Sequence, residues 1–407
     1  MNDYDRNIVR ELATRYAEVA NCPLEKKKRD LWRAKNSFKL TDPLIYVRAY
    51  AWNEMPMLKL QTADPVCRQI EFFFRNELFH ATFADDYIFE PWYSVNCIYK
   101  YSGWGVDYKL EYPGEMETLE AYKVDYAIKK LDDVKKMRAP VHAVDEAATA
   151  EKLEKVQDLI GDILTVDLIR GPYCRNWTAD ISYDLGKLRG MENFMLDMYE
   201  NPEWLHGLLK FMSEGVQRNQ EQAESAGDIG LTFTYNQAMA YAEELKDPAP
   251  NVNGVNREQL WCFTAAQEFA LVSPEMHEEF LLRYQLPIMS KFGLVAYGCC
   301  EDLTNKISML RQIPNLRRIA VSPFANVKKC AEQIGTDYVI SYRPSPADMV
   351  SYDFNEARIR QILKRDLEYL KGTYFDITLK DVETVQSDPD RIRKWVKLVR
   401  EIIAETC

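Results

Sequence analysis

Two adjacent cysteines and a glutamate form the most chemically informative group in the sequence. Cys299, Cys300 and Glu301 directly follow the apolar run at residues 293–297, which has the composition of a buried strand. Thiolate and carboxylate groups are good Zn²⁺ ligands, and a catalytic zinc ion needs only three protein ligands with a fourth position left open. The alternative is that the two cysteines pack as small hydrophobic side chains, as buried free cysteines commonly do. The position of Glu301 just beyond the strand favours a metal site.

A further ligand would have to come from a neighbouring strand end. Asp381 and Glu383 follow the last predicted strand, residues 374–379, and are the nearest carboxylates by topology. A surface turn ahead of the final helix would explain both residues equally well. Asp381 completes the predicted metal set.

Two charged residues at other predicted strand ends are candidates for catalysis. Glu268 follows the predicted strand at 260–263 and could act as a base or orient a substrate, although an exposed loop carboxylate is the alternative. Arg343 precedes Pro344, and the residue before a proline is held extended. This arginine could bind a carboxylate or a phosphate group, with a structural ion pair as the alternative.

Three residues are predicted to contact a substrate. Tyr173 and Asn236 follow predicted strands, and Trp92 belongs to the aromatic-rich segment 85–112. Aromatic side chains could line a pocket for a planar ring, and packing in the core or in a lid is the alternative for Trp92. We expect segment 85–112 to form a hairpin or lid rather than a core layer.

The four histidines do not lie at predicted strand ends. His80, His142, His206 and His277 fall in predicted helices or beside them. Acid/base catalysis by histidine and a three-histidine zinc site are therefore both disfavoured. The sequence contains no Gly-x-Ser-x-Gly elbow, and no glycine-rich turn follows a predicted strand, so a serine hydrolase, a dinucleotide-binding fold and a phosphate-binding loop are not predicted.

Composition limits the class of protein further. The chain has 407 residues, 47% hydrophobic and 28% charged, which suffices for an enzyme-sized core. The formal charge of -11 disfavours nucleic-acid binding, and no apolar run approaches the ~20 residues of a membrane span. Nine dispersed cysteines are typical of reduced thiols rather than of a secreted disulfide framework. We expect a cytoplasmic protein without nucleic-acid or membrane partners; its oligomeric state stays open, with a homodimer as one option.

The elements that would position these residues alternate between strand and helix from about residue 150 onward. Repeated β-then-α units imply a parallel sheet covered by helices. The predicted strands are 44–47, 163–169, 229–233, 260–263, 293–297, 317–321, 338–342 and 374–379. Eight strands would close a (β/α)8 TIM barrel, whose reactive residues lie just past the carboxyl ends of the strands. We therefore predict an α/β fold with a helical extension at residues 1–40 and a barrel over residues 41–407.

The stretch from residue 266 to the C-terminus resembles the uroporphyrinogen decarboxylase superfamily, in particular its branch of corrinoid- and zinc-dependent methyltransferases. The points of similarity are Ala266-Gln267-Glu268 with Ser273-Pro274-Glu275, the run from Gly293 to Glu301, and the run from Ile319 to Phe324. Weaker similarity at Leu188-Arg189-Gly190 and Asn201-Pro202-Glu203 extends the resemblance to roughly two thirds of the chain.

The resemblance implies that a methyl group moves from a small methylated substrate, such as an O-methylated aromatic, to the cobalt of a corrinoid carried by a partner protein. Zinc would act as a Lewis acid on the heteroatom of the substrate. In these methyltransferases the strand ends His-x-Cys-Gly and a second Cys comes from the final strand. Here Tyr297 stands at the His position, Cys299 at the Cys position and Asp381 near the final Cys position. A zinc site would have to be rebuilt with Cys300, Glu301 or Asp381.

Two other functions stay open. The tetrapyrrole decarboxylases carry an arginine-rich N-terminal signature that residues 44–56 lack, so decarboxylation of uroporphyrinogen itself is disfavoured. A metal-free decarboxylase or lyase of the same superfamily would use Arg343 to bind a small carboxylate. A corrinoid- or tetrapyrrole-binding module without catalysis is the other alternative.

Overall fold

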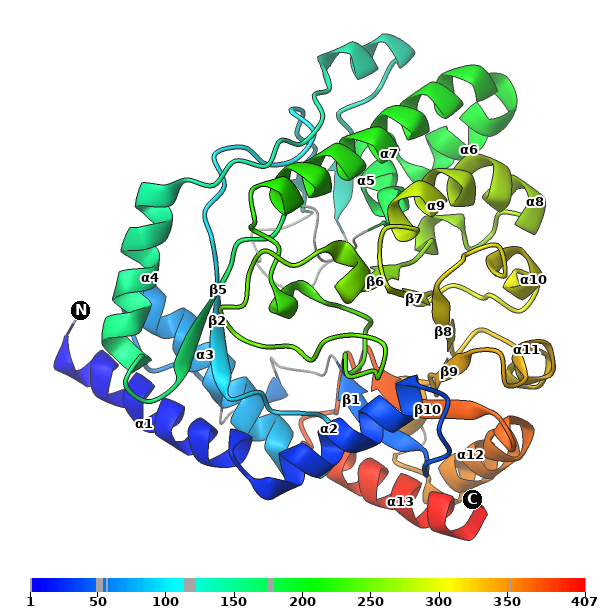
Figure 1. The fold of residues 1–407 in the computed structure, drawn as a ribbon. Helices are drawn as coiled ribbons and strands as arrows, with labels where there is room; N and C mark the ends of the chain where they lie inside the picture. The colour runs from blue at the N-terminus through cyan, green and yellow to red at the C-terminus, as the bar shows by residue number, and fades with distance from the viewer. Residues whose placement is uncertain are drawn as a thin grey trace.

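The computed structural model describes residues 2–48, 54–55, 58–112, 122–173, 179–351 and 353–406. Its main sheet has six strands, all parallel, which curl into a half-barrel (Figure 1). Their order across the sheet is β1 (Leu44–Arg48), β10 (Tyr374–Lys380), β9 (Val339–Tyr342), β8 (Leu316–Val321), β7 (Leu294–Tyr297) and β6 (Trp261–Thr264). The predicted α/β class and six of the predicted strands are confirmed.

The strands of this sheet are buried on both faces. Every residue of β6, β7 and β9 is buried, as expected for parallel strands that helices cover on one side. The helices that follow the strands lie along the outer side of the sheet in Figure 1. The inner side therefore faces the loops and side chains that fill the half-barrel.

Helices make up most of the remaining chain. The α-helices are α1 (Asp3–Ala20), α2 (Pro23–Asn36), α3 (Pro65–His80), α4 (Glu146–Ile160), α5 (Ile181–Leu188), α6 (Met191–Glu200), α7 (Pro202–Ser225), α8 (Pro274–His277), α9 (Arg283–Met289), α10 (Ile307–Leu310), α11 (Val327–Ile334), α12 (Glu356–Leu370) and α13 (Asp390–Thr406). Short 3₁₀-helices are η3 (Ala81–Phe83), η4 (Leu131–Lys136), η5 (Leu231–Phe233), η6 (Arg257–Gln259), η7 (Gln267–Phe269) and η9 (Pro346–Met349), and η8 (Glu278–Leu282) is a short π-helix. Side-chain caps define several starts: Asp64 accepts from two amides of α3, and Asn355 accepts from the Arg358 amide of α12.

The barrel is not closed among the described residues. A separate parallel pair contains β2 (Trp92–Asn96) and β5 (Thr165–Ile169), the latter within the predicted strand at 163–169. The strand prediction at 229–233 is wrong, because this segment forms the turn η5. The Phe233 amide donates to the Gly230 carbonyl, and the Leu231 amide donates to the Val252 carbonyl. The second bond lies beside an isolated antiparallel bridge between Gly230 and Asn253, so the segment makes one bridge but no strand.

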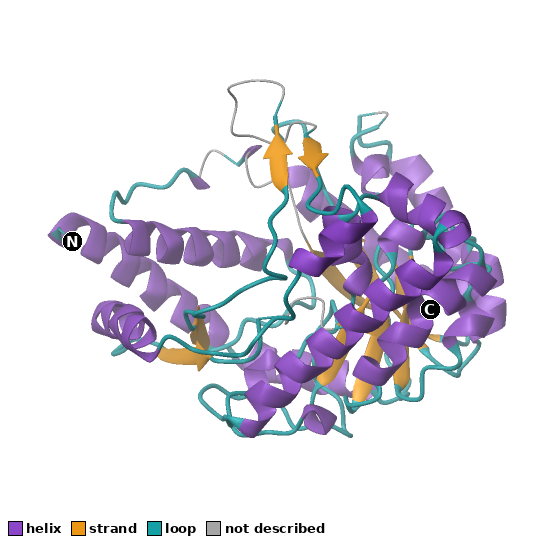
Figure 2. Ribbon diagram, turned by 90° about the horizontal axis from the view of Figure 1, so that it is seen from above, coloured by secondary structure: helices purple, strands orange, loops and turns teal. Residues whose placement is uncertain are grey.

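The aromatic-rich segment divides between two structures. Its middle forms β2, whose Tyr93 and Val95 pack in a hydrophobic cluster with residues of α1, α3 and α4. Its end forms β3 (Lys109–Glu111), which pairs antiparallel with β4 (Lys123–Asp125) and stands apart from both parallel sheets (Figure 2). The hairpin or lid prediction therefore fits only the end of the segment, since β2 is a core strand.

The N-terminal helices are joined to the main sheet by buried polar contacts. Asn36, at the end of α2, accepts a hydrogen bond from Arg318 of β8 at 2.8 Å. The same asparagine donates to the carbonyls of Met239 and Tyr241 at 2.9 and 2.8 Å. Arg318 also pairs with Asp376 of β10 at 2.6 Å, and both side chains are buried.

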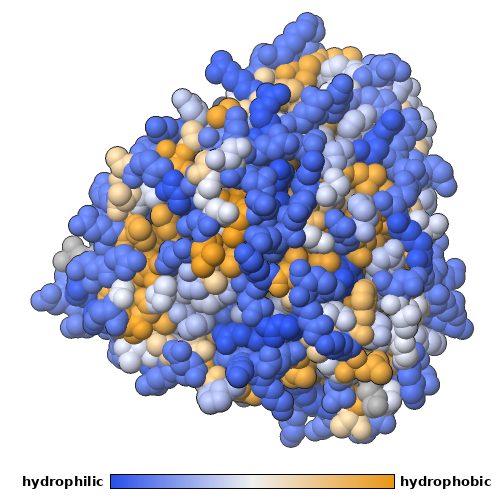
Figure 3. Space-filling view, viewed as in Figure 1, coloured by the Kyte–Doolittle hydropathy of each residue, from blue (hydrophilic) through white to orange (hydrophobic). Residues whose placement is uncertain are grey.

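The surface gives no sign of a membrane-spanning segment. Hydrophilic side chains predominate on the face in Figure 3, and hydrophobic ones gather there in small patches. Within the described part of the chain, no helix combines the length and apolar character that crossing a bilayer requires.

Candidate functional site

The predicted cysteine pair lies in a tight turn at the carboxyl end of β7. Gly298 has φ 100° and directs the chain into Cys299, which is buried, and Cys300, which is half-buried. The two sulfur atoms are 3.7 Å apart. Lys380, the last residue of β10, places its Nζ atom 2.9 Å from each sulfur. An ammonium group therefore lies between the two thiols.

The surroundings of the two thiols shift their pKa values in opposite directions, so that one is an anion and the other is neutral. The S–H of Cys300 donates to Cys299, and Arg343 and Lys380 add positive charge; together these lower the pKa of Cys299 to about 4, although burial opposes this. The hydrogen bond to Cys299, burial and the Cys299 charge raise the pKa of Cys300. The pair therefore carries one negative charge, on Cys299, at neutral pH.

Arg343 directly follows β9 and is buried. Its Nη1 atom donates to the Cys299 carbonyl, while its Nε atom has no hydrogen-bond partner. It forms no ion pair with any carboxylate of the described residues, so the structural ion pair considered as the alternative for this arginine is not formed. A buried guanidinium with a free donor is costly unless a ligand satisfies it.

A second orphan polar atom lies beside the thiolate. Gln237 has φ 59°, is buried, and donates from Nε2 to the Cys299 sulfur at 3.4 Å. Its Oε1 atom has no partner. One free donor on Arg343 and one free acceptor on Gln237, both next to Cys299, indicate a place where a polar ligand binds.

Arg48 adds a third cation to the group. Its Nη2 atom donates to the Tyr235 hydroxyl at 2.6 Å. Burial works against its charge, but nearby Tyr235, Tyr46 and Cys299 raise the pKa of Arg48 above its ordinary value. Three cations, Arg48, Arg343 and Lys380, thus lie near the Cys299 thiolate and the carboxylates of Glu301 and Asp381.

The predicted metal ligands Glu301 and Asp381 take other partners. Both carboxylate oxygens of Glu301 accept backbone amides, one from Ala266 and one from Cys299, each at 2.8 Å. Asp381 pairs with Lys380 at 2.8 Å, and its Oδ2 atom lies 3.4 Å from the Cys300 sulfur. Glu301 therefore braces the turn that holds the thiols, and Asp381 extends the ion-pair network.

The donors of this site do not fit a zinc ion. Among the described residues, no three His, Cys, Asp or Glu side chains gather in a way that could hold a metal. A zinc ion shared by the two thiols would have to displace the Lys380 ammonium, which contacts both sulfurs. Zinc binding stays a prediction, and no step proposed below depends on it.

The other predicted residues lie away from the thiols. Glu268, in η7, contacts Ser182 of α5. Asn236 is buried and braces its own turn through the Ala238 amide and the Met239 carbonyl. Trp92 is half-buried in β2, and Tyr173 is exposed beside the ring of Tyr99. No contact of the described residues joins these four to Cys299. Cys174, also at that predicted strand end, lies outside the described residues.

Sequence reasoning missed Lys380, Gln237 and Arg48. Lys380 stood one residue beyond the apolar run of the last predicted strand, directly before the selected Asp381. Gln237 stood next to the selected Asn236. For Lys380 and Gln237, the side chain that contacts the Cys299 sulfur is thus the neighbour of the selected residue.

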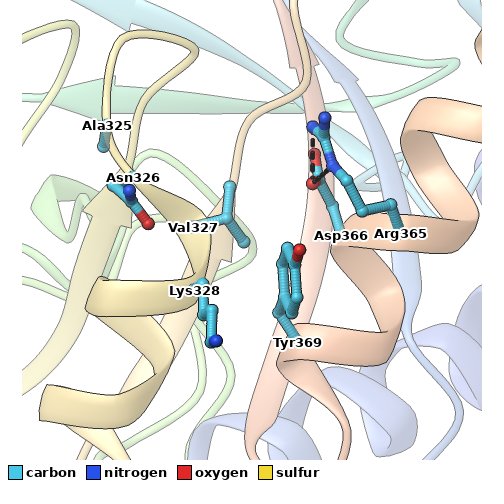
Figure 4. Close-up of a pocket in the computed structure, with 7 residues that line it drawn as sticks. All are labelled: Ala325, Asn326, Val327, Lys328, Arg365, Asp366 and Tyr369. Atoms are coloured by element: carbon cyan, nitrogen blue, oxygen red, sulfur yellow. Dashed lines mark hydrogen bonds and ion pairs between the residues drawn. The ribbon is translucent and has the colours of Figure 1, made fainter.

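Arg343 also lines a pocket of about 310 Å³ at the carboxyl ends of β8 and β9. A second pocket, of about 330 Å³, lies between α11 and α12, and both are bounded by Arg365 and Asp366. In Figure 4 the Arg365 and Asp366 side chains pair with each other at the rim, with Tyr369 beside them. Arg343 therefore lies between the thiol pair and an open polar pocket.

These features define an α/β protein with a buried site of thiol, cationic and carboxylate groups at the carboxyl ends of a curled parallel sheet, where barrel folds carry their reactive residues. No family model matches the chain, and no curated protein matches it. Among solved structures the chain is similar to a methyltransferase from Methanosarcina mazei, with a TM-score of 0.54 and 12% sequence identity. The match covers 92% of this chain and 98% of that one. At this identity the likeness concerns the fold, and the superfamily resemblance stays a prediction.

Proposed function

We propose that this protein is a methyltransferase that moves a methyl group from a small methylated substrate, such as an O-methylated aromatic, to the cobalt of a corrinoid held by a partner protein. The observation that carries the proposal is the thiolate and cation group around Cys299 at the carboxyl ends of the sheet. The likeness of nearly the whole chain to a methyltransferase supports it at the level of the fold.

Arg343 has the main electrostatic role in this mechanism. Lys380 is engaged by the two sulfurs and Asp381, and Arg48 is engaged by Tyr235. Arg343 retains a free Nε donor. As the methyl group leaves, negative charge develops on the substrate heteroatom, and a preorganised guanidinium donor stabilises that charge more than it stabilises the neutral substrate.

Gln237 and the thiolate position the substrate and the cations. The free Oε1 of Gln237 accepts a hydrogen bond from a polar group of the substrate. The Cys299 thiolate fixes the Lys380 ammonium and balances part of the positive charge. The site therefore favours a substrate that gains negative charge during the reaction.

The test is a spectral assay of cob(I)alamin methylation with a panel of methoxylated aromatics and methylamines. We expect turnover with at least one donor, and we expect Arg343→Met to lower it by about 10²-fold or more, because removing one such donor typically costs that much. Arg365→Met, which changes the rim of the neighbouring pocket, is the matched control and should leave the rate within a few-fold. Absence of methylation with every donor would contradict the proposal.

Zinc is tested separately by elemental analysis of the wild type and Cys300→Ser. Stoichiometric zinc in the wild type that is lost from the variant would support the zinc prediction. Zinc that both proteins retain equally would remove Cys300 from the ligand set, and zinc absent from both would leave the cations as the source of electrostatic stabilisation.

The two arginines at the site, Arg343 and Arg48, favour one alternative, a decarboxylase or lyase that acts on a small carboxylate. Arg343 and Arg48 would bind the carboxylate of its substrate. Release of CO₂ from small carboxylic acids, in protein that methylates no cob(I)alamin, would support this second function.

A further inference from the structure

Two carboxyl groups at the start of α5 and in the turn after β6 are bridged by a single serine hydroxyl. Asp180 caps the start of α5, and Glu268 lies in η7, which directly follows β6. The Ser182 Oγ atom is 2.7 Å from Glu268 Oε2 and is also hydrogen-bonded to Asp180 Oδ1. The hydroxyl of Ser182 therefore lies between the carboxyl groups of Asp180 and Glu268 and contacts both.

This hydrogen-bonded group of three side chains needs a proton in addition to that of the serine. A hydroxyl carries one hydrogen and can donate to only one of the two carboxyl groups. The Ser182 backbone amide donates to Asp180 Oδ1 at 3.0 Å, which does not supply the bridge. One of the two carboxyl groups must therefore be the donor in the second contact, so the pair holds one proton.

The surroundings favour the protonated pair. Asp180 is 5% exposed, and its Oδ2 atom has no hydrogen-bond partner. Burial and the negative charges of Glu268 and Glu301 raise the pKa of Asp180, against the hydrogen bond from Ser182. Burial, together with the charges of Glu301 and Asp180, also raises the pKa of Tyr297. Asp184 on α5 is also close to Glu268.

Glu301 connects this pair to the thiol site. One of its oxygens accepts the Cys299 amide, and the other accepts the amide of Ala266, two residues before Glu268. The unpartnered oxygen of Asp180 therefore lies within the same group of strand-end loops as the thiolate. An enclosed carboxyl oxygen without a partner is a position where a ligand atom completes the hydrogen bonding.

We propose that Asp180 and Glu268 share one proton through Ser182 and act as the general acid that protonates the heteroatom from which the methyl group departs. This inference rests on the proposed function. The bond between carbon and heteroatom breaks with its electron pair on the heteroatom, and the methyl group passes to the reduced cobalt. The proton moves from the carboxyl pair to the heteroatom, and solvent restores it after product release.

The kinetic test compares donors whose leaving groups do and do not need a proton. Asp180→Asn keeps the helix cap, because Asn caps as well as Asp. We expect it to lower cob(I)alamin methylation by methoxylated aromatics about 10²-fold or more, the usual range for general acids. Donors that leave as neutral molecules, such as methylsulfonium or quaternary ammonium compounds, should change only a few-fold. Glu275→Gln, which removes an exposed carboxylate, is the control. An equal loss with both classes of donor would overturn the proposal.

An infrared measurement tests the proton without any turnover. The difference spectrum between the wild type and Asp180→Asn at neutral pH should contain the carbonyl stretch of a neutral carboxylic acid, and Glu268→Gln should perturb the same band. If this spectrum shows only ionised carboxylate bands, the shared proton is wrong. If the band is present but no donor supports methylation of cob(I)alamin by the wild type, the proposed function is wrong. The role of the carboxyl pair as general acid in that reaction is then wrong as well.

Discussion

Lys380 determines the charge of the thiol pair at the level of single residues. Its ammonium contacts both sulfurs and Asp381, so the negative charge of Cys299 is stabilised in a buried place. The Cys299 charge in turn raises the pKa of Lys380, against the effect of burial. The two groups therefore ionise as an ion pair across a broad pH range.

We predict that Lys380→Met raises the pKa of Cys299 by about 1 to 3, because an adjacent opposite charge is lost. The ultraviolet absorbance of the thiolate, taken as the difference from Cys299→Ser at each pH, measures this. Lys371→Met, which removes an exposed lysine, should leave the titration unchanged. An identical titration of Cys299 in the wild type and in Lys380→Met would contradict the contact between the Lys380 ammonium and the thiolate.

The same ionisation links the fold to pH. The pKa of Cys299 is about 4 in the folded chain and 9.0 for an ordinary thiol. The thiolate therefore stabilises the fold fully above the ordinary value, and this contribution is lost as the pH falls toward about 4. The free energies of unfolding of the wild type and Cys299→Ser, measured with denaturant across this pH range, should converge at low pH.

At the scale of elements, the turn after β7 positions the thiols. Gly298 has φ 100°, and a Cβ atom there would approach Leu303 Cδ1 to 2.6 Å and Ala320 Cβ to 3.1 Å. The Glu301 carboxylate then holds the turn through two backbone amides. Both features set the direction of Cys299 toward Lys380.

We predict that Gly298→Ala lowers the free energy of unfolding by more than Gly372→Ala does. Gly372 also has a positive φ, 82°, but a Cβ atom there meets nothing within 4 Å. The control should cost about 1 to 2 kcal/mol from the backbone conformation alone, and Gly298→Ala should add a packing cost. Equal midpoints in urea unfolding would contradict this.

Strands could be predicted from sequence where an apolar run is bounded by polar residues, as in β7 and β10. The run at 229–233 could not be distinguished from a buried turn, because a short apolar segment has no periodicity that separates the two. Lys380 was missed since a lysine past an apolar run normally lies in solvent. Its burial depends on a thiolate brought close by the pairing of β10 in the sheet, a contact between residues 81 positions apart.

At the scale of the whole molecule, a buried ion pair joins the sheet to the N-terminal helices. Arg318 binds Asp376 within the sheet and Asn36 at the end of α2. Asp376 also accepts from Ser341 and Thr378. Strands β8, β9 and β10 and helix α2 therefore meet in one polar network.

We predict that Arg318→Met destabilises the protein by about 3 to 5 kcal/mol, because it leaves Asp376 buried without its cation. Arg311→Met is the matched control: Arg311 pairs with Asp337 at the surface, where such a pair contributes about 0 to 1 kcal/mol. Urea unfolding of the two variants measures the difference. Similar losses of stability would show that the network is not a structural centre.

The pairing of β1 with β10 imposes an order on folding during synthesis. The first strand of the main sheet bonds to its last strand, and β10 alone connects it to β9. A ribosome must therefore synthesise the chain through β10 before β1 can join the sheet. Lys380 and Asp381 stand at the end of that strand. The nascent chain consequently has neither a complete sheet nor its reactive thiolate environment until translation has passed β10.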